Sequence, residues 1–423
     1  MLTLINNSGS DILGRYYTKS EISSFLVSQL DLESPQRLLD LGAGSGSLSG
    51  AVKSRWPKID ILTVDIDPQS AAHHKAKDSV EPYRHQHYTI DALTRNLPDI
   101  LNSISYPIDI AVCNPPFITS QWRDEFKEIL DGAGFGNCLP SPLDVDAGLL
   151  FLAQNLRIVS HNATLAIILP DSLITAQRYL KFRKELLSNY LVSKVIQLPR
   201  GAFHGTDALA SILIIRKNRE HTSTLSLHKL SESGILSPSL EINIHEGIER
   251  LDHSYHFYKL NNHIHPALEL GEIATTVERG SLSSSTSKKS AFRVLHITDI
   301  RTEDAGQWTD FEIVDPSNCA GNIKFAQPGD ILLSRVGRNL HTKVIGVRSG
   351  RIPVSDCIYI IRCPPEARAT VLRQLSSPSG RDWLAAHSYG VAAKQIAKKQ
   401  LLKFPIHLAN RDVIWNSKKE QTN

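Results

Sequence analysis

Hydrophobic positions in the first half of the chain follow two distinct periods. Runs of consecutive apolar residues predict buried strands at 37–41, 59–64, 108–113, 163–169 and 208–215. Between them, apolar residues three or four positions apart predict helices at 47–56, 149–158 and 177–190. Apolar strands separated by helices are typical of a parallel sheet that is covered on both faces. We therefore expect an α/β fold with a Rossmann-like, doubly wound, mostly parallel sheet.

The pattern changes after residue 217. Residues 217–266 are rich in Ser, His and Asn and predict a connecting region with one or two local elements. Its histidines match no metal-ligand spacing. Short strand-like runs at 292–297, 330–334, 344–347 and 358–362 follow, separated by turn residues, and a helix-like stretch at 392–402 ends the series. A Ser-rich segment, 280–290, predicts a loop. We expect a first domain at 1–245, a linker at 246–265 and a second, mixed and mostly β domain at 266–423.

Composition narrows the class of protein. Hydrophobic residues make up 41% and charged residues 21% of the 423 positions, ordinary values for a globular protein with a large core. No run approaches the roughly 18 apolar residues of a membrane span. The five cysteines are scattered and form no Cys-x-x-Cys pair, which argues against a disulfide framework or a zinc site. We therefore expect a cytoplasmic protein that has no metal and no membrane contact.

Charge is divided unevenly between the two parts. Counting Lys and Arg against Asp and Glu, residues 1–259 have a net charge of −3 and residues 260–423 a net charge of +7. A basic second part favours a polyanionic partner, and an uneven solvated surface is the alternative.

A glycine loop and three strand-end acids suggest a nucleoside site. Asp40-Leu-Gly42-Ala-Gly44-Ser-Gly46 follows a strand and opens a helix, where glycines let the backbone approach a ligand. Asp65 ends the next strand and Asp91 a third, where carboxylates can accept hydrogen bonds from ribose and amino groups. Three acids repel a pyrophosphate but suit the cationic S-adenosylmethionine. Common turns and helix caps are the structural alternative for each element alone.

The tetrapeptide Asn114-Pro115-Pro116-Phe117 directly follows the strand 108–113. Its prolines lack N–H groups and restrict the backbone, so the loop presents the Asn114 amide oxygen and the Pro115 carbonyl as acceptors. Two such acceptors can hold both protons of an aromatic amine and localise the nitrogen lone pair for attack. Phe117 offers a flat face for a base. A proline turn that merely ends a strand is the alternative.

In this order, the motifs resemble those of the gamma-class N6-adenine DNA methyltransferases. The resemblance covers roughly residues 12–217 and includes the family's N-terminal cofactor motif at Gly14–Thr18, with Lys19 in place of its usual proline. It implies S-adenosylmethionine as the cofactor and a class I methyltransferase fold. The cofactor residues that it implies are Thr18, Asp40, Gly42, Gly44, Gly46, Asp65, Asp91 and Asn114. The catalytic residues that it implies are Asn114, Pro115, Pro116 and Phe117.

Two further segments resemble the methylation subunits of type I restriction systems: 163–170 and 201–206. This likeness implies that Phe203 stacks on the target base opposite Phe117, with a core aromatic as the alternative. Asp146 falls near another cofactor-pocket motif.

In the second part, Gly329–Arg338 and Tyr389–Lys398 resemble target-recognition domains of type I specificity subunits. The resemblance implies DNA contacts, because arginines can read guanine and lysines hold phosphates. The residues concerned are Arg335, Arg338 and Lys343 in one polar turn, and Lys394 and Lys398 along the predicted helix. A solvated helix face is the alternative for the lysines.

The sequence thus predicts a sequence-specific DNA adenine-N6 methyltransferase that acts on a flipped-out base. The expected partner is double-stranded DNA, a cognate restriction endonuclease is a candidate partner, and the protein is expected to be a monomer or homodimer. An RNA or protein-glutamine methyltransferase is one alternative. A catalytically silent DNA-binding specificity protein is another.

Overall fold

The structure, a computed structural model, describes residues 18–70, 85–102, 107–139, 144–218, 222–262, 267–290, 292–315, 323–391 and 393–407. The chain divides into two compact units, Met1–His256 and Phe257–Asn423. The division falls within helix α10 (His253–Asn261), inside the segment 246–265 predicted to be a linker, which also holds part of helix α9 (Ile244–Glu249). Among the described residues, no helix is long and apolar enough to cross a membrane.

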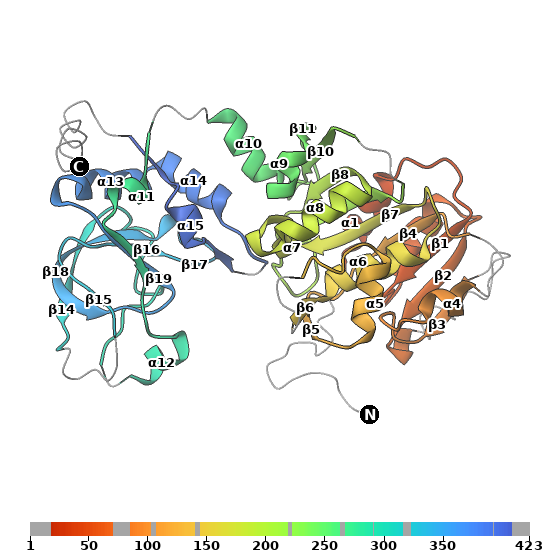
Figure 1. Ribbon diagram of the computed structural model, residues 1–423, viewed down its shortest axis with the longest axis horizontal. Helices are drawn as coiled ribbons and strands as arrows, with labels where there is room; N and C mark the ends of the chain where they lie inside the picture. The colour runs from red at the N-terminus through yellow and green to blue at the C-terminus, as the bar shows by residue number, and fades with distance from the viewer. Residues whose placement is uncertain are drawn as a thin grey trace. The chain divides into compact units, whose positions relative to one another are not determined.

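The first unit is built on a nine-stranded sheet with the order β11-β10-β8-β9-β7-β4-β1-β2-β3 (Figure 1). Its strands are β1 (Arg37–Leu41), β2 (Asp60–Asp65), β3 (His85–Thr89), β4 (Ile110–Cys113), β7 (Thr164–Pro170), β8 (Leu191–Gln197), β9 (Ala210–Arg216), β10 (Thr224–Lys229) and β11 (Leu240–Asn243). Strand β9 is antiparallel to both β7 and β8, and β11 is antiparallel to β10. The other neighbours are parallel. The prediction of a mostly parallel sheet is confirmed.

Helices cover this sheet on both faces. Every residue of β1, β4 and β7 is buried, and because successive strand residues point to opposite faces, both faces must be covered. Figure 1 shows α5, α6 and α8 lying over the sheet. The helices are α1 (Ser20–Ser28), α2 (Ser47–Arg55), α4 (Leu97–Asn102), α5 (Glu125–Gly132), α6 (Ala147–Ile158), α7 (Asp171–Thr175) and α8 (Leu180–Asn189), with a 3₁₀ turn, η2, at Gln177–Tyr179. A small hairpin pairs β5 (Thr119–Gln121) with β6 (Asp144–Asp146).

The order of the strands creates a crevice in the first unit. From β1 the chain continues to β2 and β3 on one side, whereas β4 and β7 lie on the other side of β1. The parallel strands β1, β2 and β4 end at the same edge, and the reversal of strand order leaves space there for a ligand.

The prediction for residues 217–266 is wrong. Strands β10 and β11 extend the main sheet, and α9 and α10 follow them. Their apolar signal is weak because β11 forms the sheet edge and β10 lies next to it, so that only Ile242 of β11 and half of the residues of β10 are buried.

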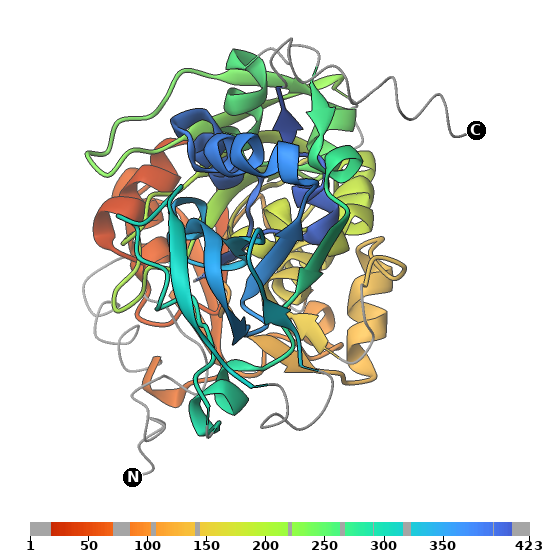
Figure 2. The same ribbon diagram turned by 90° about the vertical axis from the view of Figure 1, so that its left-hand side faces the viewer.

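The second unit contains a six-stranded mixed sheet. Its main path is β13-β19-β16-β18-β14, with β15 paired to β18. These strands are β13 (Thr276–Arg279), β14 (Trp308–Ile313), β15 (Phe325–Ala326), β16 (Ile331–Ser334), β18 (Val344–Pro353) and β19 (Ile358–Arg362). Figure 2 shows them as teal and blue arrows. Two short pairs join β12 (Leu268–Glu269) to β21 (Pro405–Ile406) and β17 (Val336–Gly337) to β20 (Lys394–Gln395).

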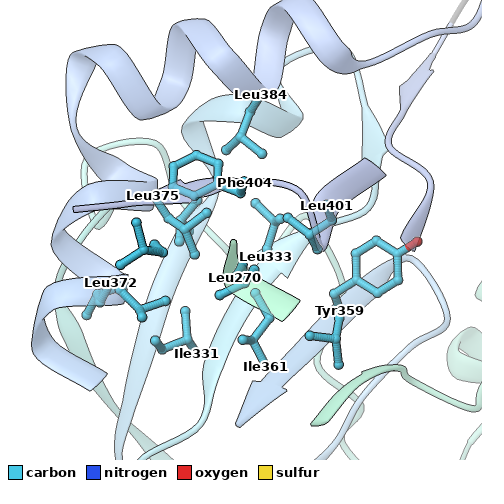
Figure 3. Packing of buried hydrophobic residues seen from close by; sticks show 14 of the residues in the cluster. Leu270, Ile331, Leu333, Tyr359, Ile361, Leu372, Leu375, Leu384, Leu401 and Phe404 are labelled. Atoms are coloured by element: carbon cyan, nitrogen blue, oxygen red, sulfur yellow. The ribbon is translucent and has the colours of Figure 1, made fainter. Parts of the chain in front are cut away.

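Helices close one face of this second sheet. They are α11 (Leu270–Ile273), α13 (Pro365–Ser376), α14 (Pro378–His387), α15 (Lys398–Leu401) and the 3₁₀ turn η4 (Leu340–Thr342). A further helix, α12 (Ser284–Lys289), follows β13 along the chain. Figure 3 shows Leu372 and Leu375 of α13 packed with Ile331 and Ile361 of the sheet. Burial of this apolar cluster gives the second unit its own core.

Three predictions for the second unit are wrong. Residues 292–297 form no strand, and only Leu295 makes an isolated bridge, to Val354. The Ser-rich segment contains α12, because the Ser283 hydroxyl accepts a hydrogen bond from Thr286 N and caps the helix. The helix predicted at 392–402 is the strand β20 followed by the single-turn helix α15, so Lys394 and Lys398 do not share a helix.

A buried arginine in the first unit ties helix ends together. The side chain of Arg183, on α8, is fully buried, and burial lowers its pKa to about 10, so it remains charged near neutral pH. Its guanidinium donates to four main-chain carbonyls, at 2.7 to 3.1 Å, near the ends of α7 and α9: Leu173, Ala176, Ile248 and Glu249.

We expect Arg183→Met to lower the free energy of unfolding by about 3 kcal/mol, because four buried carbonyls lose their donor. Urea denaturation measures the change. The control is Lys184→Met, which removes the exposed cation at the next position. Equal stability of the two variants would contradict the role of the guanidinium.

Candidate functional site

The glycines of the loop after β1 have a left-handed backbone conformation. Gly42, Gly44 and Gly46 have φ angles of 72°, 52° and 74°, a conformation that glycine adopts without strain. A Cβ atom on Gly42 would lie 3.2 Å from the ring of Phe151. The residue type at Gly42 is therefore dictated both by the backbone and by the packing.

The acid at the end of β2 holds this loop in place. Asp65 Oδ2 accepts a hydrogen bond from Gly44 N at 2.7 Å, and Oδ1 accepts one from Asp67 N at 2.8 Å. The loop is also paired to β2 through Gly42 N and the Val64 carbonyl, 2.8 Å apart. The carboxylate of Asp65 thus orders the loop.

A cavity of about 290 Å³ opens at the crevice of the first unit. This is at the lower end of the range for small-molecule sites, roughly 300 to 1,000 Å³. Eight of the predicted site residues line it: Thr18, Asp40, Gly42, Gly44, Asp65, Asp91, Asn114 and Pro116. The cavity lining does not include Gly46, Pro115, Phe117 or Phe203. The structure therefore brings the predicted cofactor residues together at one site, with Gly46 as the N-cap of α2.

Asp40 lies at the bottom of this crevice. Its side chain is 1% exposed, and Oδ2 accepts a hydrogen bond from Ser49 N at 3.2 Å. Burial, together with the nearby negative charge of Asp65, raises the pKa of Asp40 to about 7. A cationic ligand would favour the ionised carboxylate.

Asp91 also lines the cavity, and both of its carboxylate oxygens have partners. Oδ1 accepts a hydrogen bond from Leu93 N at 2.8 Å, and Oδ2 pairs with Arg123 Nη1 at 2.7 Å. The Arg123 guanidinium also lies 4.6 Å from the ring centroid of Phe126. Arg123 thus borders the cavity and fixes the orientation of the Asp91 carboxylate.

The tetrapeptide predicted to be catalytic, Asn114 to Phe117, begins where β4 ends. The Asn114 amide nitrogen donates to the Thr18 hydroxyl at 2.9 Å. This bond directs the amide oxygen away from Thr18. Of the predicted N-terminal motif, only Thr18 lies within the described residues.

The two predicted stacking aromatics are in contact. The ring centroids of Phe117 and Phe203 are 5.4 Å apart, and the ring planes are inclined at 80°. Phe203 is 2% exposed. This edge-to-face packing leaves the pair without a parallel gap, so a flat base could stack there only after one ring turned.

Asp146 does not line the cavity. It caps α6 by accepting a hydrogen bond from Gly148 N at 2.9 Å, and the Ser172 hydroxyl donates to its other oxygen at 3.4 Å. Burial raises the pKa of Asp146 to about 6. Its neighbour Ala147 does line the cavity, so Asp146 positions that wall through the helix.

Sequence reasoning missed several residues of the cavity wall. Ile66 lines the cavity and is 53% exposed. Its position directly after the strand-end acid Asp65 is the sequence signal that could have revealed it. Phe151 has the spacing of a core residue on α6. Arg123 comes from a separate segment after β5, for which the sequence offers no signal.

The basic residues singled out in the second unit have different surroundings. Arg335 Nε donates to the Asp356 carbonyl at 2.8 Å, and Lys343 Nζ donates to the Ile297 carbonyl at 2.6 Å. Arg338 is exposed, and the register of β17 with β20 places Gly337 opposite Lys394. Main-chain carbonyls therefore hold the side chains of Arg335 and Lys343. Lys394 lies on the short β17–β20 ribbon, and Arg338 directly follows β17.

The fold and the site define an α/β protein with an acid-lined cavity at the carboxyl ends of its strands. Residues 2–285 match the family described as N-6 DNA Methylase. The chain belongs to this family. Among the described residues, no group of three or more His, Cys, Asp or Glu side chains could hold a metal ion.

Individual relatives match shorter stretches. The chain is 29% identical over 113 residues to a type I restriction enzyme MpnII methylase subunit of Mycoplasma pneumoniae, covering 26% of this chain and 21% of that protein. It is 28% identical over 123 residues to a tRNA1(Val) (adenine(37)-N6)-methyltransferase of Flavobacterium psychrophilum, covering 29% and 50%. The matched stretches thus span half or less of these curated relatives.

A solved structure, that of the type IIG restriction endonuclease BpuSI, has a TM-score of 0.47 and 13% identity to this chain. The alignment covers 95% of this chain and 59% of that one.

We expect the affinity for the predicted cofactor, S-adenosylmethionine, to rise by about tenfold between pH 6 and pH 8, because ionisation of Asp40 through its raised pKa of about 7 creates the charge that a cation prefers. Below that pKa the carboxyl is protonated and the attraction is lost. Calorimetric titration at several pH values measures the affinity.

Asp40→Asn should weaken this pH dependence, whereas Asp60→Asn, which removes the acid paired with Arg37 at the start of β2, should retain it. The same pH dependence in wild type and Asp40→Asn would show that Asp40 does not contribute.

Proposed function

We propose that the protein is a sequence-specific DNA adenine-N6 methyltransferase of a restriction-modification system. The observation that carries this proposal is the position of Asn114 on the wall of the cavity that Asp40, Gly42 and Asp65 also line. An amine-binding loop and an acid-rich nucleoside cavity therefore adjoin each other, as methyl transfer to a base requires.

The residues of the cavity fit S-adenosylmethionine. The left-handed glycines allow close backbone approach, and the carboxylates of Asp40, Asp65 and Asp91 suit its amino and ribose groups. The exposed apolar side chain of Ile66 offers a flat adenine a surface to pack on. When bound, this cofactor supplies an electrophilic methyl group.

Asn114 and Pro115 would hold the adenine amine. The Asn114 amide oxygen, directed away from Thr18, and the Pro115 carbonyl would each accept a hydrogen bond from one N–H of the amine. The nitrogen lone pair then points out of the ring plane, and the alignment lowers the barrier to attack. Phe117 and Phe203 would hold the base by stacking once their edge-to-face contact opens.

The second unit would hold the DNA duplex as a target-recognition domain. Arg338 and Lys394 are the proposed contacts on the β17–β20 ribbon, with Lys398 on α15 beyond it. Arg381 adds to this basic surface, next to the neutral imidazole of His341. Burial and the positive charges of Lys394 and Arg381 lower the pKa of His341, which indicates that these cations lie close together.

We place the protein in the cytoplasm. The described cysteines are all free, as in a reducing compartment: Cys113, Cys138, Cys357 and Cys363. A cognate restriction endonuclease and a monomeric or homodimeric state belong to the same proposal.

Methylation of RNA is the second candidate function. It is favoured by the similarity to a tRNA adenine-N6 methyltransferase over 123 residues. Equal affinity for structured RNA and for duplex DNA would support it over the DNA proposal.

We expect Asn114→Ala to lower methyl transfer by about 100- to 1,000-fold, because the amine loses an acceptor where charge develops. The measurement is transfer of labelled methyl groups to genomic DNA from a host that lacks this gene. Asn261→Ala, an exposed amide on α10, is the matched control. A variant that methylates at the normal rate would remove Asn114 from the mechanism.

Duplex DNA binding should weaken steeply between about 50 and 200 mM salt, because binding releases counterions. We expect Lys394→Ala to reduce the slope of log affinity against log salt by about 1. Fluorescence anisotropy with mixed-sequence duplexes measures it. Lys181→Ala, an exposed lysine of α8 in the first unit, should leave the slope unchanged. An unchanged slope for Lys394→Ala would show that Lys394 does not contact the DNA.

A further inference from the structure

Thr18 lies where three functional segments of the first unit meet. Its hydroxyl accepts the hydrogen bond from Asn114, and its carbonyl accepts one from the Ser47 hydroxyl at 3.3 Å. Its backbone forms an isolated antiparallel bridge with Phe203. Thr18 is 7% exposed. One buried residue therefore contacts the catalytic loop, the glycine-loop helix and the segment of the predicted stacking aromatic.

The bond to Thr18 determines which end of the Asn114 amide faces the amine. An asparagine side chain has a donor end and an acceptor end, and both are needed in a defined orientation. The Thr18 hydroxyl oxygen lies 2.9 Å from the amide nitrogen and accepts a hydrogen bond from it. The acceptor end is then directed the other way. Without this acceptor, rotation by 180° about the last side-chain bond would present N–H groups to the amine protons.

Backbone contacts of Thr18 and its neighbour hold the Thr18 hydroxyl within hydrogen-bonding distance of Asn114. The bridge to Phe203 and the hydrogen bond from Lys19 N to the Ala202 carbonyl, at 3.5 Å, hold Thr18 against its neighbouring loop. The Ser47 hydroxyl also lies 2.8 Å from that of Ser23, on α1. Contacts on several sides leave Thr18 little freedom to move.

Resting on the proposed function, we infer that Thr18 is a positioning residue for methyl transfer: its hydroxyl sets the orientation of the Asn114 amide. The resemblance to the gamma-class enzymes implies that Thr18 also binds the carboxylate of the cofactor's methionine part, and the positioning role is additional to that contact. A threonine hydroxyl can accept one hydrogen bond and donate another, so it can serve Asn114 and a carboxylate together.

The test compares Thr18→Val, which keeps the shape of the side chain and removes its polar atom, with Thr18→Ser, which keeps the hydroxyl. The substrate is genomic DNA from a host without this gene, and the rate of labelled-methyl transfer is measured at saturating S-adenosylmethionine and DNA. Cofactor affinity is measured separately by calorimetry. Saturation separates a loss of positioning from a loss of cofactor binding.

We expect Thr18→Val to lower kcat on the order of 100-fold, the scale of a misplaced reacting group, and Thr18→Ser to remain within a few-fold of wild type. If Thr18→Val does not fold, Thr18→Ala provides the same comparison against Thr18→Ser, since those two variants differ by one hydroxyl. A cofactor-affinity change alone, with normal kcat at saturation, would overturn the inference.

Thr206→Val is the matched control. Thr206 also pairs with Phe203, and its hydroxyl accepts a hydrogen bond from Ala208 N at 3.1 Å, not from Asn114. The same loss of a hydroxyl there should leave kcat within about threefold of wild type. An equal loss of rate in Thr18→Val and Thr206→Val would show that the loss comes from a disturbed Phe203 segment and not from the Thr18 hydroxyl, and would overturn the inference. Absence of methyl transfer by the wild type would instead refute the proposed function.

Discussion

The parallel pairing of β1 with β2 on one side and β4 on the other is the constraint on which the site depends. Parallel strands end at the same edge of a sheet, and the reversal of strand order at β1 opens a crevice there. The glycine loop follows β1, Asp65 is the last residue of β2, and Asn114 follows β4. They are far apart along the chain, yet they line one cavity because the strands that carry or precede them are neighbours.

Burial and charge then give the cavity its chemical character. Asp40 is buried at the end of an entirely buried strand, and this burial raises its pKa to about 7. Asp65 and Asp91 use some of their oxygens to hold backbone N–H groups and so order the loops that carry them. The same carboxylates therefore form part of the cavity wall and suit the cationic nucleoside that we propose as its ligand.

Local sequence predicted the elements whose signal is strong over several consecutive residues. The strand 37–41 was predicted at the bounds observed for β1, and the helix 47–56 within one residue of α2. Predictions failed where tertiary contacts outweigh local pattern. Strands β10 and β11 are half polar and are stabilised by pairing with the sheet edge, and β20 exists because it pairs with β17.

By itself, the sequence determined the identity and order of the chemical groups: the glycine loop, the strand-end acids and Asn114 to Phe117. It could do so because each motif depends on short-range backbone geometry, such as the left-handed glycines and the donor-free prolines. Only the tertiary structure decided which side chains face one another. The bond from Asn114 to Thr18, the ion pair of Arg123 with Asp91 and the edge-to-face rings join residues separated by 32 to 96 positions. Sequence spacing carries no information about contacts at such separations, because they arise from the packing of whole strands and helices.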